Sequence, residues 1–141
     1  MKLLPLLMIL VGAPVSCVAS GFCERLPIDP ELPAGLGGSY EVIGKDPVTG
    51  DGYTATLVLD YGKKSYALTR ASQRSTVNGD AWIERCGMDR IKVLVARYYT
   101  KPLTEVSCAL AADGNNYYRT TCRTRQGGST WRGLEAWFQR P

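Results

Sequence analysis

A chain of 141 residues has the length of one domain, and its seventeen basic and thirteen acidic side chains leave a formal net charge of only +4 at neutral pH. The sequence has no histidine, which excludes the commonest general base, the usual activator of a catalytic serine or cysteine, and the commonest metal ligand. It has no CxxC pair either, so we expect no metal site and no cofactor.

The first twenty residues have the pattern of a cleaved secretion signal. A lysine at the second position precedes an apolar run over residues 3–11, which is too short to span the ~30 Å hydrocarbon core of a bilayer. We expect cleavage before Gly21, which removes residues 1–20. The stretch ending at Cys17 also resembles a lipobox, although Pro14 stands where a lipobox normally has an aliphatic residue. We therefore expect a periplasmic or secreted protein, with an outer-membrane-anchored lipoprotein as the alternative.

The cysteines agree with export. Without Cys17 four remain, an even number that is typical of two disulfides in an oxidising compartment. If the asparagine-rich segment between Cys108 and Cys122 is a three-residue hairpin loop, these two cysteines fall opposite each other. Cys23 is then left to pair with Cys86.

A proline- and glycine-rich lead over residues 21–38 precedes an antiparallel β domain over residues 39–141. Short alternating segments bounded by turn residues recur at the spacing of a β-barrel or β-sandwich. Short connections favour an up-and-down meander, and closure into a barrel removes exposed edges. We predict an all-β fold, a small antiparallel up-and-down barrel of about eight strands with two disulfides; an open β-sandwich is the alternative. The expected strands cover residues 39–44, 53–60, 65–70, 75–84, 91–99, 104–111, 117–125 and 130–139.

Basic residues are concentrated in the second half of the chain. Residues 70–141 contain twelve basic side chains, ten of them arginine, against six acidic ones, whereas residues 18–69 contain four against seven. Guanidinium groups bind carboxylates and phosphates through two parallel hydrogen bonds. Strand alternation places three of these arginines on one face of residues 117–125, although such a row can also be a solvated face that resists aggregation. The candidate binding residues are Arg119, Arg123, Arg125, Arg132, Tyr118, Trp131 and Trp137.

Paired carboxylates are the catalytic device that this composition still allows. Glu135 stands out because alternation puts it on one strand face with two tryptophans, so that it points inward or into an aromatic groove. We expect no catalytic site, and a carboxylate-based hydrolase is the remote alternative. Its candidate residues are Asp80, Glu84, Glu105 and Glu135.

Three short motifs carry a resemblance. Residues 38–44 read Gly-x-Tyr-x-Val-x-Gly, residues 52–57 contain Tyr-x-Ala-x-Leu, and residues 133–135 read Gly-x-Glu. The chain resembles a loose group of uncharacterised bacterial exported proteins and lipoproteins, in which the second motif has glycine where this chain has Ala55. The resemblance implies export and transfers no catalytic residue. In size and architecture the expected calycin-like barrel also resembles small periplasmic inhibitors of lysozymes or proteases.

These observations favour a non-enzymatic exported binding protein of the bacterial envelope, an inhibitor or immunity-type partner of another exported protein. The expected partner is an exported protein or an anionic envelope component, because arginine, tyrosine and tryptophan dominate protein interfaces. We expect no contact with nucleic acid, from which export separates the chain. Membrane contact is expected only through a lipid anchor. The alternative is a carrier that holds a small apolar ligand in the barrel interior.

Overall fold

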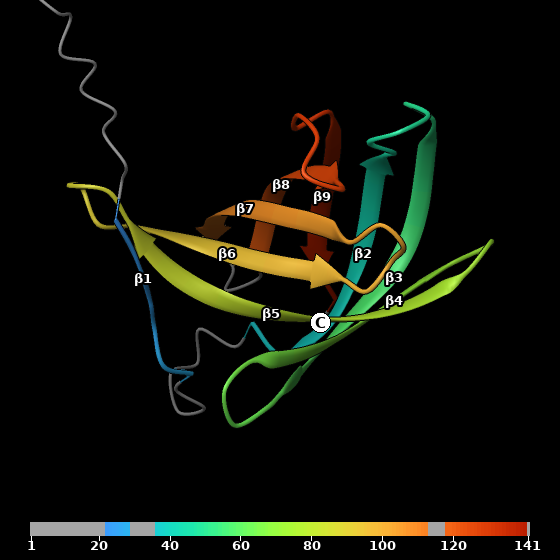
Figure 1. The fold of residues 1–141 in the computed structure, drawn as a ribbon. Helices are drawn as coiled ribbons and strands as arrows, with labels where there is room; N and C mark the ends of the chain where they lie inside the picture. Colours follow the sequence, from blue (N-terminus) through green and yellow to red (C-terminus); the bar gives the residue numbers. More distant parts are fainter. Residues whose placement is uncertain (1–21, 29–35, 113–117, 141) are drawn as a thin grey trace, which may run out of the picture.

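The computed structural model describes residues 22–28, 36–112 and 118–140, and every regular element within them is a β-strand (Figure 1). The described part therefore contains no long apolar helix that could cross a membrane. The expected signal over residues 1–20, with its lipobox-like Cys17, lies outside the described residues and stays a prediction.

Each of the eight expected strands is present. Their bounds differ from the expected ones by a few residues, most of all in the last strand, which begins at Gly133. The short first strand was not expected, because three residues within a proline-rich lead carry no strand pattern of their own. The strands are β1 (Cys23–Arg25), β2 (Gly38–Lys45), β3 (Gly52–Tyr61), β4 (Tyr66–Ser72), β5 (Thr76–Cys86), β6 (Ile91–Tyr98), β7 (Thr104–Ala112), β8 (Tyr118–Gln126) and β9 (Gly133–Gln139).

The sheet closes on itself. Strands β2 to β9 pair with their neighbours in sequence, all antiparallel, and β2 also pairs with β9, which completes an eight-stranded barrel. β1 extends the sheet beside the end of β5, where Glu24 lies opposite Arg85. The predicted up-and-down barrel is confirmed, and the open sandwich is not the architecture.

The barrel interior is filled by every second residue of each strand. In β3, Leu57 and Leu59 are buried whereas Thr56 and Asp60 are exposed, which is the alternation that the sequence shows. Aromatic rings contribute to this interior, and the rings of Tyr40 and Trp137 meet edge to face with their centroids 6.1 Å apart. The interior is therefore a packed core. The largest completely buried side chains are Trp137, Tyr40, Tyr98, Leu36, Leu57, Leu59, Leu68, Leu94, Glu135, Val42, Val106 and Thr120.

Both predicted disulfides are present. Cys108 and Cys122 lie opposite each other on β7 and β8, are completely buried in the barrel, and are joined inside it. Cys23 is exposed and is joined to the half-buried Cys86 at the end of β5. One disulfide therefore lies within the core, and the other attaches the lead to the barrel wall.

We expect the two disulfides to differ in their accessibility to a reductant. A mild thiol reductant added to the folded protein should cleave Cys23–Cys86 first, because an attacking thiolate must reach one of the sulfur atoms. Cys108–Cys122 should react only when the whole barrel opens. Alkylation followed by mass spectrometry measures the order, and in concentrated urea the two bonds should react together. Early alkylation of Cys108 in the folded protein would contradict this arrangement.

Candidate functional site

Glu135 is a carboxylate inside the barrel. It points inward from β9, and its side chain has no exposed surface. Trp137, two residues further along β9, is on the same inner face. Of the two orientations that the sequence allows for Glu135, the structure has the inward one.

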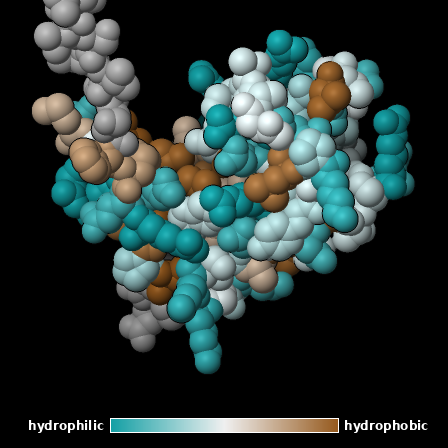
Figure 2. All heavy atoms as spheres, viewed as in Figure 1, coloured by the Kyte–Doolittle hydropathy of each residue, from teal (hydrophilic) through white to brown (hydrophobic). Residues whose placement is uncertain are grey.

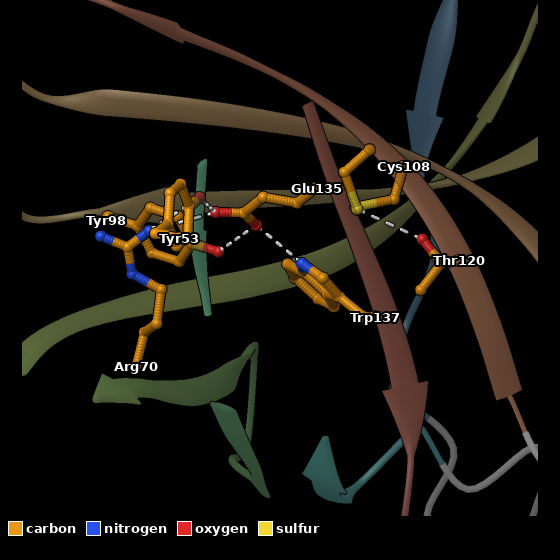
Figure 3. The surroundings of a disulfide bond; sticks show 8 residues. Tyr53, Arg70, Tyr98, Cys108, Thr120, Glu135 and Trp137 are labelled. Carbon is orange, nitrogen blue, oxygen red and sulfur yellow. Dashed lines mark hydrogen bonds and ion pairs between the residues drawn. A yellow bond between two sulfur atoms is a disulfide. The ribbon is translucent and has the colours of Figure 1, made fainter. Parts of the chain in front are cut away.

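Four side chains from four strands donate to this carboxylate (Figure 3). Its Oε2 accepts hydrogen bonds of 2.7 Å from the Tyr98 hydroxyl and from Nε1 of Trp137. Its Oε1 accepts one from the Tyr53 hydroxyl and another, 3.1 Å long, from Nη1 of Arg70, which also forms the ion pair. A carboxylate without contact to water needs such donors, since burying an unpaired charge is costly.

Arg70 connects this cluster to the end of the barrel. Its guanidinium lies 4.4 Å from the centroid of the Tyr98 ring and 5.2 Å from that of Tyr53, close enough for cation–π attraction. Its side chain is 17% exposed, and its Nε is buried without a partner among the described residues. The positive charge is thus held between two rings and one carboxylate, with a narrow path to solvent.

Burial and the neighbouring charge change the titration of these groups. Burial foremost, and then the negative charge of Glu135, raise the pKa of Tyr53 and of Tyr98 far above the usual tyrosine range. Burial alone would lower the pKa of Arg70, but Tyr98 and Glu135 together with Tyr53 raise it. Both hydroxyls therefore stay protonated and donate to Glu135, and Arg70 stays charged.

Two glycines leave room for this arrangement. A Cβ at Gly44 would overlap the Tyr53 ring, and a Cβ at Gly133 would overlap Oγ1 of Thr124. These glycines and Glu135 belong to the short motifs that carry the sequence resemblance. Those motifs thus place inward-facing residues around the buried carboxylate.

The four candidate carboxylates do not converge. Glu135 is inside the barrel, whereas alternation along β5 puts Asp80 and Glu84 on the outer face. Glu105 is on the outer face of β7 and pairs with Arg125 at 2.6 Å. Glu135 therefore has no second candidate carboxylate beside it, whereas Asp80 and Glu105 lie on the same outer face, on either side of Arg97.

The predicted arginine row lies on the outer face of β8. Arg119 and Arg123 are exposed and form no ion pair with the described residues. Arg125 is engaged, because it pairs with Glu105 and its guanidinium lies 4.7 Å from the centroid of the Trp131 ring. Arg119 and Arg123 are therefore the two members of the row that are open to a partner.

The other candidate binding residues are in different places. Arg132 and Trp131 are exposed in the connection before β9, where Arg132 donates to Oγ1 of Thr130. Tyr118 begins β8, and its side chain lies outside the described residues. Trp137, also a candidate binding residue, is completely buried on the inner face with Glu135, so it is part of the core and does not line the outer surface.

An exposed apolar patch borders the arginine row, and the sequence analysis missed it. Leu134 and Phe138 lie on the outer face of β9, opposite Arg123 and Arg119 of β8. Ile43 of β2 lies diagonally between them on the other side of β9. We call this outer surface of Ile43, Leu134, Phe138, Arg119 and Arg123 the docking face.

A surface pocket adjoins the docking face at the end of the barrel. It has a volume of about 460 Å³ and opens between the β2–β3 and β4–β5 turns. Its lining includes Ile43 of the docking face, Tyr53 of the inner cluster, and the acidic Asp46 and Asp51. The docking face thus has a hollow at one border that can receive a side chain of a partner.

Comparisons with known proteins give no relative for this chain, since no protein-family model, curated protein or solved structure matches it.

We expect Glu135→Gln to destabilise the barrel by about 3–5 kcal/mol, because it leaves the buried charge of Arg70 uncompensated. Urea denaturation monitored by tryptophan fluorescence measures the change. The double variant Glu135→Gln/Arg70→Met should recover part of the loss, since it removes both charges. The control is Glu105→Gln, which breaks a partly exposed ion pair and should cost less than about 1 kcal/mol. Equal losses in the two single variants would contradict the buried ion pair.

We also expect stability to fall above about pH 10, where tyrosines of the unfolded chain ionise. Folded Tyr53 and Tyr98 keep their protons above that pH, whereas the same tyrosines ionise in the unfolded chain. Their contribution to the free energy of unfolding is therefore complete only below about pH 10. It is lost above it, by about 1.4 kcal/mol per pH unit for each tyrosine. Urea denaturation from about pH 9 to about pH 11 measures the slope, which Tyr98→Phe should reduce by one tyrosine's contribution. An unchanged slope in Tyr98→Phe would mean that this hydroxyl titrates normally.

Proposed function

We propose that the protein is a non-enzymatic exported binding protein of the bacterial envelope, an inhibitor or immunity-type partner that docks another exported protein on its docking face. The observation that carries the proposal is the exposed patch of Ile43, Leu134 and Phe138, bordered by the guanidinium groups of Arg119 and Arg123. Contiguous apolar groups rimmed by charge are typical of protein interaction sites.

This pattern supports a protein partner over an anionic polysaccharide. A polysaccharide would use the arginines but would leave the aliphatic and aromatic side chains of Ile43, Leu134 and Phe138 without a counterpart. A protein surface with apolar residues beside carboxylates matches both features, because arginine binds carboxylates bidentately. The two disulfides are compatible with an oxidising location, where such a partner would also be found.

The packed interior of the barrel gives less support to the two alternative functions, an apolar-ligand carrier and a hydrolase. A carrier of a small apolar molecule needs an enclosed space, whereas the centre of this barrel is occupied by Tyr40, Trp137 and Tyr98, all without exposed surface. A hydrolase built on Glu135 would need that carboxylate to reach substrate, and its four donors and its burial oppose this.

A pull-down from envelope extract tests the proposal. Immobilised wild type should recover a specific exported protein, and Arg119→Ala/Arg123→Ala or Leu134→Asp should recover much less of it. With the partner purified, each variant should raise the dissociation constant at least about tenfold, since central interface residues cost over 1 kcal/mol when truncated.

The matched control is Lys63→Ala/Lys101→Ala, which removes two exposed basic residues in the β3–β4 and β6–β7 turns that neither belong to the docking face nor line its pocket. It should bind like wild type, which separates local contacts from the effect of net charge. Recovery of no partner by wild type, or equal affinity of all variants, would remove the docking face as a binding site.

A further inference from the structure

A second exposed apolar surface lies on the other side of the barrel. Phe22 is 92% exposed and Met88 is fully exposed, and their backbones are neighbours because Gly87, which precedes Met88 in the β5–β6 turn, donates a hydrogen bond to the Phe22 carbonyl. Ile91, at the start of β6, is 58% exposed. Figure 2 shows apolar side chains gathered at the left of the view, over the β5–β6 turn and the start of β1. We call Phe22, Met88 and Ile91 the β5–β6 tip.

The tip is held in place from both sides. The Cys23–Cys86 disulfide joins the residue after Phe22 to the last residue of β5, and Ile91 lies opposite Cys86 on β6. These apolar side chains are therefore presented on a stapled hairpin, and exposing them costs free energy in water. Nothing else in the described chain covers them, since each is more than half exposed.

Basic residues surround the tip. Between Arg85 and Lys92 the hairpin carries three basic residues and one acidic one. Glu24 of β1 forms an exposed ion pair with Arg90 at 3.8 Å, which leaves Arg85 and Lys92 without an ion pair among the described residues. Arg90 and Lys92 are exposed within or beside the turn. Apolar side chains flanked by lysine and arginine are the combination that inserts into the headgroup region of an anionic membrane, with the charges adding electrostatic attraction.

The position of the tip also favours a membrane as its occupant. In the lipoprotein alternative, in which Cys17 is acylated and kept, Phe22 is five residues after the anchor, a distance of at most about 18 Å along the chain. β5 is four strands away from β9 in either direction round the barrel, and β6 is three strands away by way of β7 and β8, so the tip lies across the barrel from β9 (Figure 1). A membrane at the tip therefore leaves the docking face free.

We propose that the β5–β6 tip is a membrane-docking site that inserts Phe22, Met88 and Ile91 among the headgroups of an anionic phospholipid surface. The sequence analysis expected membrane contact only through a lipid anchor, whereas this site binds the bilayer directly. It does not depend on the docking of a partner protein.

Vesicle flotation tests the site on protein that cannot be acylated. The full chain is exported with Cys17→Ser and mixed with vesicles of phosphatidylethanolamine and phosphatidylglycerol, or of phosphatidylcholine alone. The protein should float with the anionic vesicles, less with the neutral ones, and less at high salt. Met88→Ser/Ile91→Ser should weaken partitioning at least about tenfold, because two apolar side chains no longer enter the interface.

Ile43→Ser/Leu134→Ser is the matched control, since it removes two similarly exposed aliphatic side chains from the docking face and should float like the parent. Circular dichroism and disulfide mapping verify that the variants keep the barrel. The proposal is overturned if the parent does not float, or if the tip variant floats equally well. It is also overturned if the parent self-associates through the tip and the tip variant is monomeric, because the occupant is then a second copy of the chain.

Discussion

The pairing of β2 with β9 is the constraint on which the rest of the structure depends. It joins the first and last strands of the meander over six residue pairs, from Tyr40 opposite Gln139 to Lys45 opposite Leu134. Once the sheet is closed, every strand of the barrel has an inner and an outer face, and its backbone groups are paired on both sides. The closed barrel has no free edge at the β2–β9 junction, so the docking proposed above relies on the outer side chains. The exposed Leu134 and Ile43 are direct products of this pairing, because they lie on the outer side of the two strands that it joins.

The buried Glu135 matters more for selecting the register of β9 than for stabilising the barrel. Replacing a buried ion pair by well-packed apolar residues is often neutral or stabilising, so the pair with Arg70 does not by itself explain why the barrel is stable. It does penalise incorrect pairing. A slip of one residue in β9 would turn Glu135 outward and Leu134 inward, leaving the hydroxyls of Tyr53 and Tyr98 and the charge of Arg70 buried without their acceptor. We interpret the cluster as a device that selects one register for the strand that closes the barrel, at the cost of desolvating a charge.

Local patterns were sufficient for the eight barrel strands and for Cys108–Cys122, since a period of two and a short hairpin loop act between neighbours. Cys23–Cys86 was predicted only because these two cysteines remained, and β1 was not predicted. They were insufficient for contacts between distant strands: Tyr53 and Glu135 are 82 residues apart, and only closure brings them together. They also could not choose the inner face of β6, where Val93 and Val95 compete with Leu94 and Ala96, and the second pair is buried. The docking face was missed because Leu134, read alone, is a core residue. The arginine row was visible, since three arginines at alternating positions of one short segment need no tertiary information.

The Cys23–Cys86 disulfide fixes the β5–β6 tip to the barrel wall, and the docking face lies on the other side of that barrel. β1 has only three residues and pairs with the sheet along one side, so without a covalent link it would fray from β5. The disulfide prevents this and fixes Phe22 beside the β5–β6 turn, which turns a flexible entry into part of a stiff tip. A membrane bound there would constrain the orientation of the whole barrel, because β5 and β6 are part of its wall. Since the docking face lies across the barrel from that wall, the disulfide would determine which way the arginines of β8 point relative to the bilayer. The Cys23–Cys86 disulfide would then set the orientation of the protein on the bilayer. This role would be separate from the stability that any cross-link gives by lowering the entropy of the unfolded chain.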